Sequence, residues 1–156
     1  MTSATIHASA VLTGARAVLI RGPSGAGKSR LALDLIEAGR SGPLRFARLV
    51  GDDRVHVQAA GGRLLVRPAE ALAGLIEVRG LGILRLPYEP SAVVGLVVDL
   101  GACAERLPNP GEGQATVEGI GLPRLAVADG KGALRAVLAL LTSGAADFAS
   151  RTSPLL

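Results

Sequence analysis

The sequence predicts an α/β domain, and two observations point to this class. A buried apolar strand at residues 17–20 runs through a glycine-rich turn into an amphipathic helix at residues 29–39. Several short strands elsewhere are joined in pairs by glycine turns. The 156 residues are 49% hydrophobic, which suits one domain. A chain of this length buries roughly 68–70% of its surface, so we expect a single domain over residues 1–156 that needs no disulfide or metal for stability.

The N-terminal half begins with two predicted strands and a helix. Loose alternation over residues 5–13 and the continuous apolar run at 17–20 indicate two strands joined by a turn at Gly14. The second strand is expected to be fully buried. In residues 29–39, apolar side chains recur at helical spacing, and Gly39 offers a C-terminal stop.

Hairpins and a terminal helix are predicted for the rest of the chain. Gly61 and Gly62 form the turn of one hairpin, and residues 69–74 suit a short helical turn. Residues 108–113 are rich in proline and glycine and predict a loop, whereas residues 132–148 have helical periodicity. The strands expected here span residues 46–50, 55–59, 63–67 and 93–100, with a second hairpin over 114–127.

The composition argues against a nucleic-acid partner. The net charge of +4 comes from 17 basic residues, 15 of them arginine, which are scattered and form no basic run. Aromatic residues make up only 2% of the chain, so bases have almost no stacking platform. Scattered arginines suit bidentate contact with phosphate or carboxylate groups instead.

The chain also lacks the sequence marks of export. Its N-terminal stretch has no basic region before the apolar part, and no apolar run approaches about 20 residues. Its one cysteine, Cys103, cannot form an intramolecular disulfide, and no Cys/His spacing typical of a metal site exists. We therefore expect a cytoplasmic protein with no membrane partner.

The strongest motif lies between the buried strand and the first helix. It matches GxxxxGK[ST], the Walker A pattern of phosphate-binding loops. Glycines let backbone N–H groups turn toward phosphate oxygens, and the helix N-terminus attracts anions. Lys28 would reach the terminal phosphates, and Ser29 would ligate Mg²⁺. The alternative is a glycine-rich turn that only joins strand to helix. The motif consists of Gly22, Pro23, Ser24, Gly25, Ala26, Gly27, Lys28 and Ser29.

Phosphoryl transfer also needs a metal-binding acid and a proton acceptor. Asp52 and Asp53 follow an apolar stretch, and Asp99 follows another, so both positions suit acids at strand ends. Two adjacent carboxylates could divide the roles, one ionised for metal and one exchanging a proton. The alternatives are a solvated turn for the pair and a strand-end or capping acid for Asp99. Whether Asp99 binds metal is left open.

Further candidates lie on either side of this acid pair. The imidazole of His7 could donate to phosphate, although a lone histidine is more often structural. Glu77 and Arg79 would pair a metal ligand with a rigid guanidinium, and Gly80 and Gly82 would let the backbone approach a ligand. The alternative for this segment is a surface ion pair beside a bulge.

The segments GPSGAGKS, GDDRV and IEVRGLGI, in this order and at these spacings, resemble the catalytic domain of the HPr kinase/phosphorylase family. The resemblance covers about residues 5–127. Members of the family phosphorylate a seryl hydroxyl of the phosphocarrier protein HPr with ATP and Mg²⁺, and many reverse the step by phosphorolysis. The family resembles phosphoenolpyruvate carboxykinase in its P-loop core. This implies a mixed sheet with antiparallel hairpins and flanking helices.

The resemblance assigns roles by position. His7 matches a motif histidine of the family, and Lys28 and Ser29 match its P-loop lysine and Mg²⁺ ligand. Asp53 falls on the catalytic acid/base, which takes the seryl proton, and Asp52 would help to place the metal. The resemblance also makes Glu77 a metal ligand and Arg106 a catalytic arginine.

The sequence departs from the family pattern in three places. Only six residues precede His7, so we expect the family's N-terminal regulatory domain to be absent. The stretch beginning at Ala126 reads AVADGKGAL where the family reads like PVxxGR, which argues against phosphorolysis without excluding it. The chain ends at Leu156, soon after its last helix, so the hexameric assembly of the family is left open.

We therefore expect an ATP- and Mg²⁺-dependent serine kinase acting on HPr by in-line transfer. Two alternatives stay open: a nucleotide-sensing regulatory module without turnover, and a P-loop kinase of a small molecule. The sequence does not decide between ATP and pyrophosphate as donor.

Overall fold

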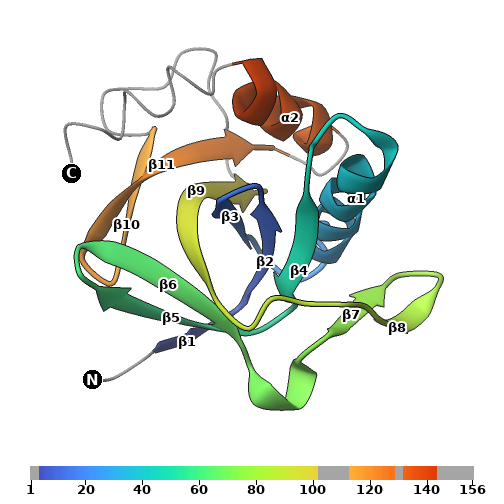
Figure 1. Cartoon of the computed structure of the whole chain (residues 1–156), viewed down its shortest axis with the longest axis horizontal. Helices are drawn as coiled ribbons and strands as arrows, with labels where there is room; N and C mark the ends of the chain where they lie inside the picture. The colour runs from blue at the N-terminus through green and yellow to red at the C-terminus, as the bar shows by residue number, and fades with distance from the viewer. Residues whose placement is uncertain (1–3, 102–112, 129–131, 144–156) are drawn as a thin grey trace.

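The computed structural model describes residues 4–101, 113–128 and 132–143. These residues form a curled mixed sheet with two α-helices packed against one of its faces (Figure 1). A separate two-stranded hairpin lies beside this body. The predicted class, α/β with a mixed sheet, antiparallel hairpins and flanking helices, is confirmed.

The described residues contain eleven strands, two α-helices and one short 3-10 helix. The helices are α1 (Lys28–Ser41) and α2 (Ala133–Ser143), with the 3-10 helix at Glu70–Leu72. The strands are β1 (Ala4–Ile6), β2 (Ala8–Thr13), β3 (Arg16–Arg21), β4 (Ala47–Gly51), β5 (Val55–Ala60), β6 (Arg63–Pro68), β7 (Leu75–Val78), β8 (Gly82–Arg85), β9 (Ala92–Leu100), β10 (Gln114–Val117) and β11 (Ile120–Val127).

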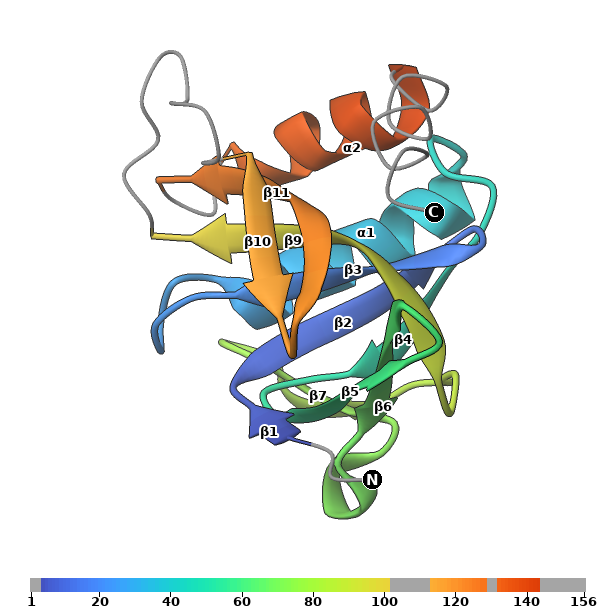
Figure 2. The ribbon, with the colours of Figure 1, turned by 90° about the vertical axis from the view of Figure 1, so that its left-hand side faces the viewer.

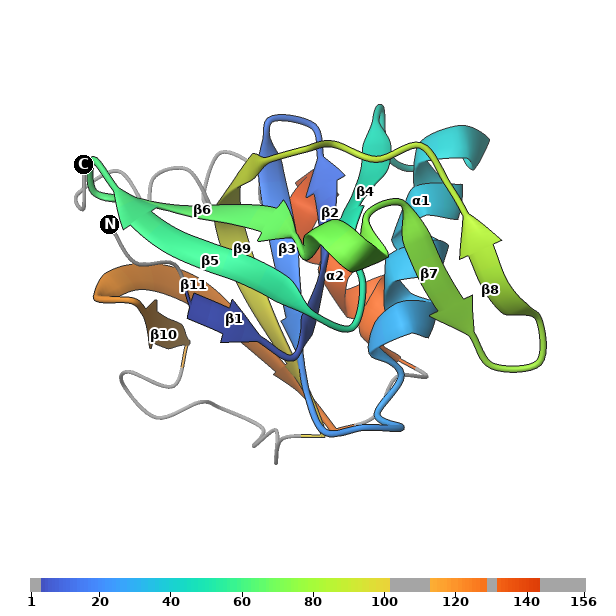
Figure 3. The same ribbon diagram turned by 90° about the horizontal axis from the view of Figure 1, so that it is seen from below.

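Strand β9 is the centre of the sheet. One edge of β9 pairs with β3 in parallel, while the other edge pairs with β6 at its start and with β11 at its end. The two partners on that edge separate, so the sheet divides into a β1-β5-β6 part and a β10-β11 part (Figure 2). The parallel strands β3, β9 and β11 all end at one edge of the sheet (Figure 3).

Alternation along the central strands creates two cores. In β3, Val18 and Ile20 pack toward the helices, while Ala17 and Leu19 pack toward the inside of the curled sheet. Helix α1 contributes Leu31, Leu35 and Ile36 to the first core. Both cores are aliphatic, as expected for a chain with so few aromatic residues.

Two pairings differ from the sequence prediction. The strand predicted at residues 5–13 is broken at His7, and its first part, β1, pairs with β5 instead of continuing beside β3. The hairpin predicted at 114–127 does form, but β11 also pairs in parallel with β9. Local alternation cannot reveal either feature, because both depend on partners distant in sequence. The loop predicted at 108–113 and the end of the 132–148 helix lie largely outside the described residues.

The segment with two closely spaced glycines forms the β7–β8 hairpin. Its turn contains Gly80 and Gly82, both with φ near +90° (+88° and +93°). The two strands pair only with each other, and β7 packs against α1 at the edge of the molecule (Figure 3). Leu81 and Ile83 are more than 60% exposed there (67% and 68%).

Replacing Gly39 by alanine tests the packing of α1 on β4. A Cβ at Gly39 would lie 2.7 Å from both the Cβ and the backbone nitrogen of Ala47. Helix propensity favours alanine by about 1 kcal/mol, but overpacking costs about 1–3 kcal/mol. We expect Gly39→Ala to lower Tm by several degrees in a thermal unfolding experiment.

The control for this substitution is Gly121→Ala, because a Cβ there has nothing within 4 Å. Its Tm should stay close to that of the unchanged protein. A Tm for Gly39→Ala that equals or exceeds the control would show that α1 does not approach β4 as closely as described.

Candidate active site

The glycine-rich loop, residues 22–27, connects the end of β3 to the start of α1. Gly27 is the N-cap of α1 and has φ +101°, a left-handed conformation that a side chain disfavours. No side chain caps the helix N-terminus, so its first backbone N–H groups stay available to an acceptor. An exposed helix N-terminus of this kind suits an anion.

Lys28 folds back over the same loop. Its Nζ donates hydrogen bonds to the carbonyl oxygens of Gly22 at 2.8 Å and Pro23 at 3.1 Å. The ammonium group therefore lies at the loop whose amides could bind phosphate. This arrangement fits the role that the motif predicts for Lys28.

Asp52 is a buried acid of the predicted site that accepts several hydrogen bonds. Its side chain is almost fully buried (3% exposed). The Ser29 hydroxyl lies 2.8 and 2.9 Å from its two oxygens, and the backbone N–H of Glu77 donates to Oδ2 at 3.1 Å. The Ser9 hydroxyl donates to Oδ1 at 2.6 Å. A buried carboxylate needs such donors to offset its lost hydration.

Strand pairing explains why Asp52 lies there. In the β2–β4 ladder, Gly51 is opposite Ala10. Asp52, the residue after Gly51, therefore lies beside Ser9, the residue before Ala10 on the neighbouring strand. Because α1 packs over β2 and β4, the carboxylate also meets Ser29 in the first turn of the helix.

Asp53 lies in different surroundings from its neighbour. Its side chain is exposed, and its φ is +68°. The N–H of Arg54 donates to the carbonyl oxygen of Asp52 at 2.7 Å, so Asp53 is the central residue of a γ-turn. Such a backbone costs on the order of 1–3 kcal/mol and is often found at functional sites. The acid pair is thus divided by burial, with Asp52 turned inward and Asp53 facing solvent.

His7 lies at the break between β1 and β2 and is exposed. Its Nε2 is 3.4 Å from Nη2 of Arg54, the residue that follows the acid pair. The structure therefore brings His7 to the same turn as Asp53, although the two are far apart in sequence.

The β7–β8 hairpin reaches the site from the other side. Glu77 contributes its backbone N–H to Asp52, while its own carboxylate is exposed. Nη2 of Arg79 lies 3.9 Å from the position that a Cβ on Gly25 would take. The turn glycines Gly80 and Gly82 are exposed and have nothing within 4 Å of a Cβ position. Arg106 lies outside the described residues.

The other strand-end acid, Asp99, belongs to an ion cluster. Arg21 donates to both of its oxygens, at 2.8 and 2.9 Å, and Arg124 donates to Oδ2. Burial raises the pKa of Asp99, but the hydrogen bonds and charges of the two arginines outweigh burial and hold this pKa below its ordinary value. Its neighbours Val98 and Leu100 pack toward the helices, so Asp99 points to the other face of the sheet, away from the helix side where Asp52 meets Ser29.

Magnesium fits Ser29 and Asp52 better than a cage of protein ligands. Within the described ranges no group of three or more His, Cys, Asp or Glu side chains could hold a metal ion. Mg²⁺ usually takes one or two protein oxygens and completes its shell with water and substrate phosphates. The hydroxyl of Ser29, beside the buried Asp52 carboxylate at the glycine-rich loop, is a donor set of that kind.

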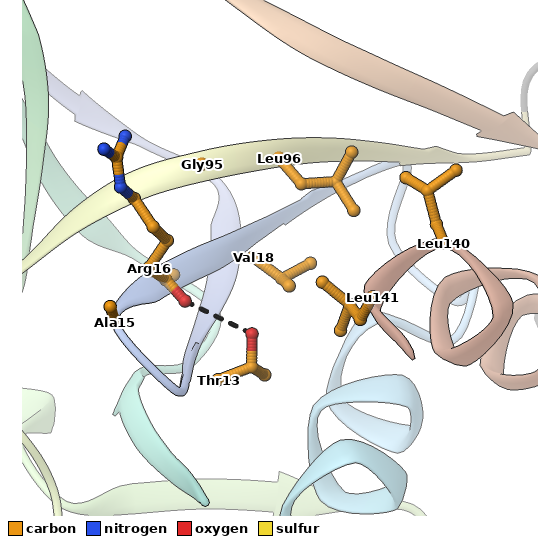
Figure 4. Close-up of a pocket in the computed structure, with 9 residues that line it drawn as sticks. Thr13, Ala15, Arg16, Val18, Gly95, Leu96, Leu140 and Leu141 are labelled. Atoms are coloured by element: carbon orange, nitrogen blue, oxygen red, sulfur yellow. Dashed lines mark hydrogen bonds between the residues drawn. The ribbon is translucent and has the colours of Figure 1, made fainter. Parts of the chain in front are cut away.

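Two cavities lie away from these residues. One, of about 150 Å³, is lined by the β2–β3 turn, β9 and α2 (Figure 4). The other, of about 250 Å³, lies between the β5–β6 and β10–β11 turns and the start of β9. Neither cavity is lined by a residue of the predicted site. The candidate active site is therefore the region around the glycine-rich loop, and not either of these cavities.

Ser9 is not among the residues that the sequence predicts for the site. This side chain is fully buried in β2 and bonds to Asp52. A polar residue in an otherwise apolar run was a weak signal, because serine is common in strands that face solvent.

The fold is shared with a solved structure of known class. The Hpr(Ser) kinase/phosphatase from Coxiella burnetii matches with a TM-score of 0.74, over 92% of this chain and 97% of that one, at 22% identity. At this identity the likeness shows a common fold. The sequence model described as the HPr Serine kinase C-terminal domain matches residues 1–88, more than half of the chain. The chain belongs to this family.

Curated relatives agree with this assignment. The HPr kinase/phosphorylase of Streptococcus thermophilus is 40% identical over 123 residues, and that of Streptococcus pyogenes is 39% identical over the same length. Each match covers 70% of this chain and 37% of the relative, so the chain matches little more than a third of these proteins. Of the helices in the described part, none is long and apolar enough to cross a membrane.

Asp99→Asn tests the ion cluster through its pH dependence. A carboxyl whose folded pKa is depressed contributes stability that is present above its unfolded value near 3.8, and this contribution is lost as the pH falls through the lower folded pKa. We expect Asp99→Asn to cost about 2 kcal/mol in urea unfolding at pH 7, because hydrogen bonds between charged groups are lost. The cost should shrink as the pH falls below the folded pKa of Asp99, where the carboxyl of the unchanged protein is protonated too. A cost that is independent of pH would contradict the pairing.

Proposed function

We propose that this chain is an ATP- and Mg²⁺-dependent protein kinase that phosphorylates a seryl hydroxyl of HPr. Family membership gives the reaction class, because the relatives are named HPr kinase/phosphorylase. The observation that carries the proposal is the contact between the Ser29 hydroxyl, at the glycine-rich loop, and the buried carboxylate of Asp52. It joins the phosphate-binding motif to an acid suited to a metal.

The loop and Lys28 would bind the nucleotide. Backbone N–H groups of the loop and the N-terminus of α1 would hold phosphate oxygens, and Lys28 would leave its two carbonyl partners to contact the β- and γ-phosphates. Arg79, which lies near Gly25, would add a guanidinium to the same phosphates. Bound Mg²⁺ would neutralise the phosphate charge, with Ser29 as a ligand and Asp52 beside it.

Transfer would then proceed in line. The seryl oxygen of HPr attacks the γ-phosphorus, a new O–P bond forms, and the bond to the β,γ-bridging oxygen breaks to release ADP. Asp53 accepts the seryl proton, since it is the exposed acid of the pair. His7 lies at the same turn and would contact phosphate or substrate there. In the other direction, phosphorolysis would return a proton from Asp53 to the seryl oxygen. The segment beginning at Ala126 is where this chain departs from the family pattern for that reaction.

Lys28→Ala tests nucleotide use. We expect labelled γ-phosphate to move from ATP and Mg²⁺ to purified HPr with the unchanged protein and not with Lys28→Ala, because the terminal phosphates lose their cation. Arg30→Ala is the matched control, since Arg30 is an exposed cation two residues further along α1. Adding inorganic phosphate afterwards shows whether phosphorolysis is retained.

Three outcomes would contradict the proposed kinase. ATP binding without labelled HPr indicates a nucleotide sensor or a different acceptor, and ATP consumption with a small acceptor in the absence of HPr indicates a metabolite kinase. Label transfer that survives Lys28→Ala would remove the loop from the mechanism.

Asp53→Asn separates nucleotide binding from transfer. Loss of a general base typically lowers a rate by about 10²–10⁴-fold, so we expect transfer to HPr to fall by that factor while ATP affinity stays within about twofold. Asparagine tolerates a positive φ, so the γ-turn and Tm should be preserved. Transfer at the unchanged rate would exclude Asp53 as the base.

A further inference from the structure

Ser9 is a buried hydroxyl that contacts both acids of the site. Its side chain is 0% exposed in the middle of β2. Its Oγ donates to Oδ1 of Asp52 at 2.6 Å and accepts a longer hydrogen bond, 3.4 Å, from the backbone N–H of Asp53. One side chain therefore connects β2 to two consecutive residues of the turn.

The polarity of this small network is fixed. The ionised carboxylate of Asp52 can only accept and the N–H of Asp53 can only donate. The single hydroxyl proton of Ser9 must therefore point at Asp52, which leaves an oxygen lone pair for Asp53. Neither hydrogen bond can reverse without breaking the other.

The network also limits how the Asp52 carboxylate can turn. Oδ1 accepts from Ser9 and Ser29, and Oδ2 accepts from Ser29 and the N–H of Glu77. A metal bound to a lone pair of Ser29 Oγ would leave its O–H free to donate to Asp52, so Ser9, Ser29 and the backbone of Glu77 would hold the carboxylate together. Ser9 is then the one side chain in the described network, apart from Ser29, that sets the plane of the carboxylate.

We propose that Ser9 is a positioning residue that orients Asp52 toward the metal at Ser29 and braces the strained turn at Asp53. The inference rests on the proposed function only in taking Asp52 and Ser29 as the place of the metal. Ser9 itself contacts neither nucleotide nor metal and acts through the two acids.

The experiment measures metal binding apart from turnover. Mn²⁺ replaces Mg²⁺, and its affinity is determined by electron paramagnetic resonance with a non-hydrolysable ATP analogue present. Loss of one hydrogen bond to a charged group changes an equilibrium by about tenfold to a hundredfold, and part of this loss falls on metal binding. We expect Ser9→Ala to weaken Mn²⁺ binding by at least threefold, while affinity for the metal-free analogue stays unchanged.

Two further variants separate positioning from stability. Ser9→Thr keeps the hydroxyl and should restore Mn²⁺ affinity to within about twofold of the unchanged protein. Val11→Ala removes apolar packing from the same face of β2, where Val11 is fully buried, and should lower Tm without changing Mn²⁺ affinity. If Ser9→Ala does not fold, Ser9→Cys keeps the side-chain volume, donates a weaker hydrogen bond, and should weaken Mn²⁺ binding as well.

The outcomes distinguish this inference from the proposed kinase. Normal Mn²⁺ affinity in Ser9→Ala or Ser9→Cys, with Mn²⁺ bound by the unchanged protein, overturns the role of Ser9 and leaves the kinase intact. Equal losses in Ser9→Ala and Val11→Ala reduce Ser9 to a packing role and overturn it too. No Mn²⁺ binding by the unchanged protein overturns the metal site and, with it, both proposals.

Discussion

The arrangement of the site depends on the hydrogen bonds that the buried carboxylate of Asp52 accepts. A charge removed from water is costly unless donors surround it, and here each donor comes from a different element: Ser9 from β2, Ser29 from α1 and Glu77 from β7. Satisfying this one group therefore fixes the glycine-rich loop, the sheet edge and the β7–β8 hairpin relative to one another. Removing any donor would leave part of a buried charge unpaired.

Asp52 and Asp99 both lie at strand ends, but they point to opposite faces of the sheet and meet different partners. Asp52 follows β4 and turns toward α1, where two hydroxyls and one backbone N–H donate to it. Asp99 lies near the end of β9 on the other face, where Arg21 and Arg124 pair with it in an ion cluster. Both acids follow apolar runs and look alike in the sequence. Their different partners follow from the alternation of side chains across the sheet.

Much of the fold was predictable because it is encoded locally. The strand, glycine loop and α1 follow from an apolar run, a motif and helical spacing, and the β5–β6 hairpin follows from Gly61 and Gly62. The break at His7, the parallel pairing of β11 with β9 and the arginine partners of Asp99 depend on residues far apart in sequence. Ser9 was missed for the same reason, because its importance comes from β4 lying beside β2. Arg106 lies outside the described residues, and its role stays a prediction.

The most direct test of this account is the position of the metal in a crystal of the chain grown with Mn²⁺ and a non-hydrolysable ATP analogue, located by anomalous scattering. The account predicts a single strong peak within ligand distance of Ser29 Oγ, beside Asp52 and the terminal phosphates. A peak at Asp99, or nucleotide phosphates bound away from the glycine-rich loop, would contradict it.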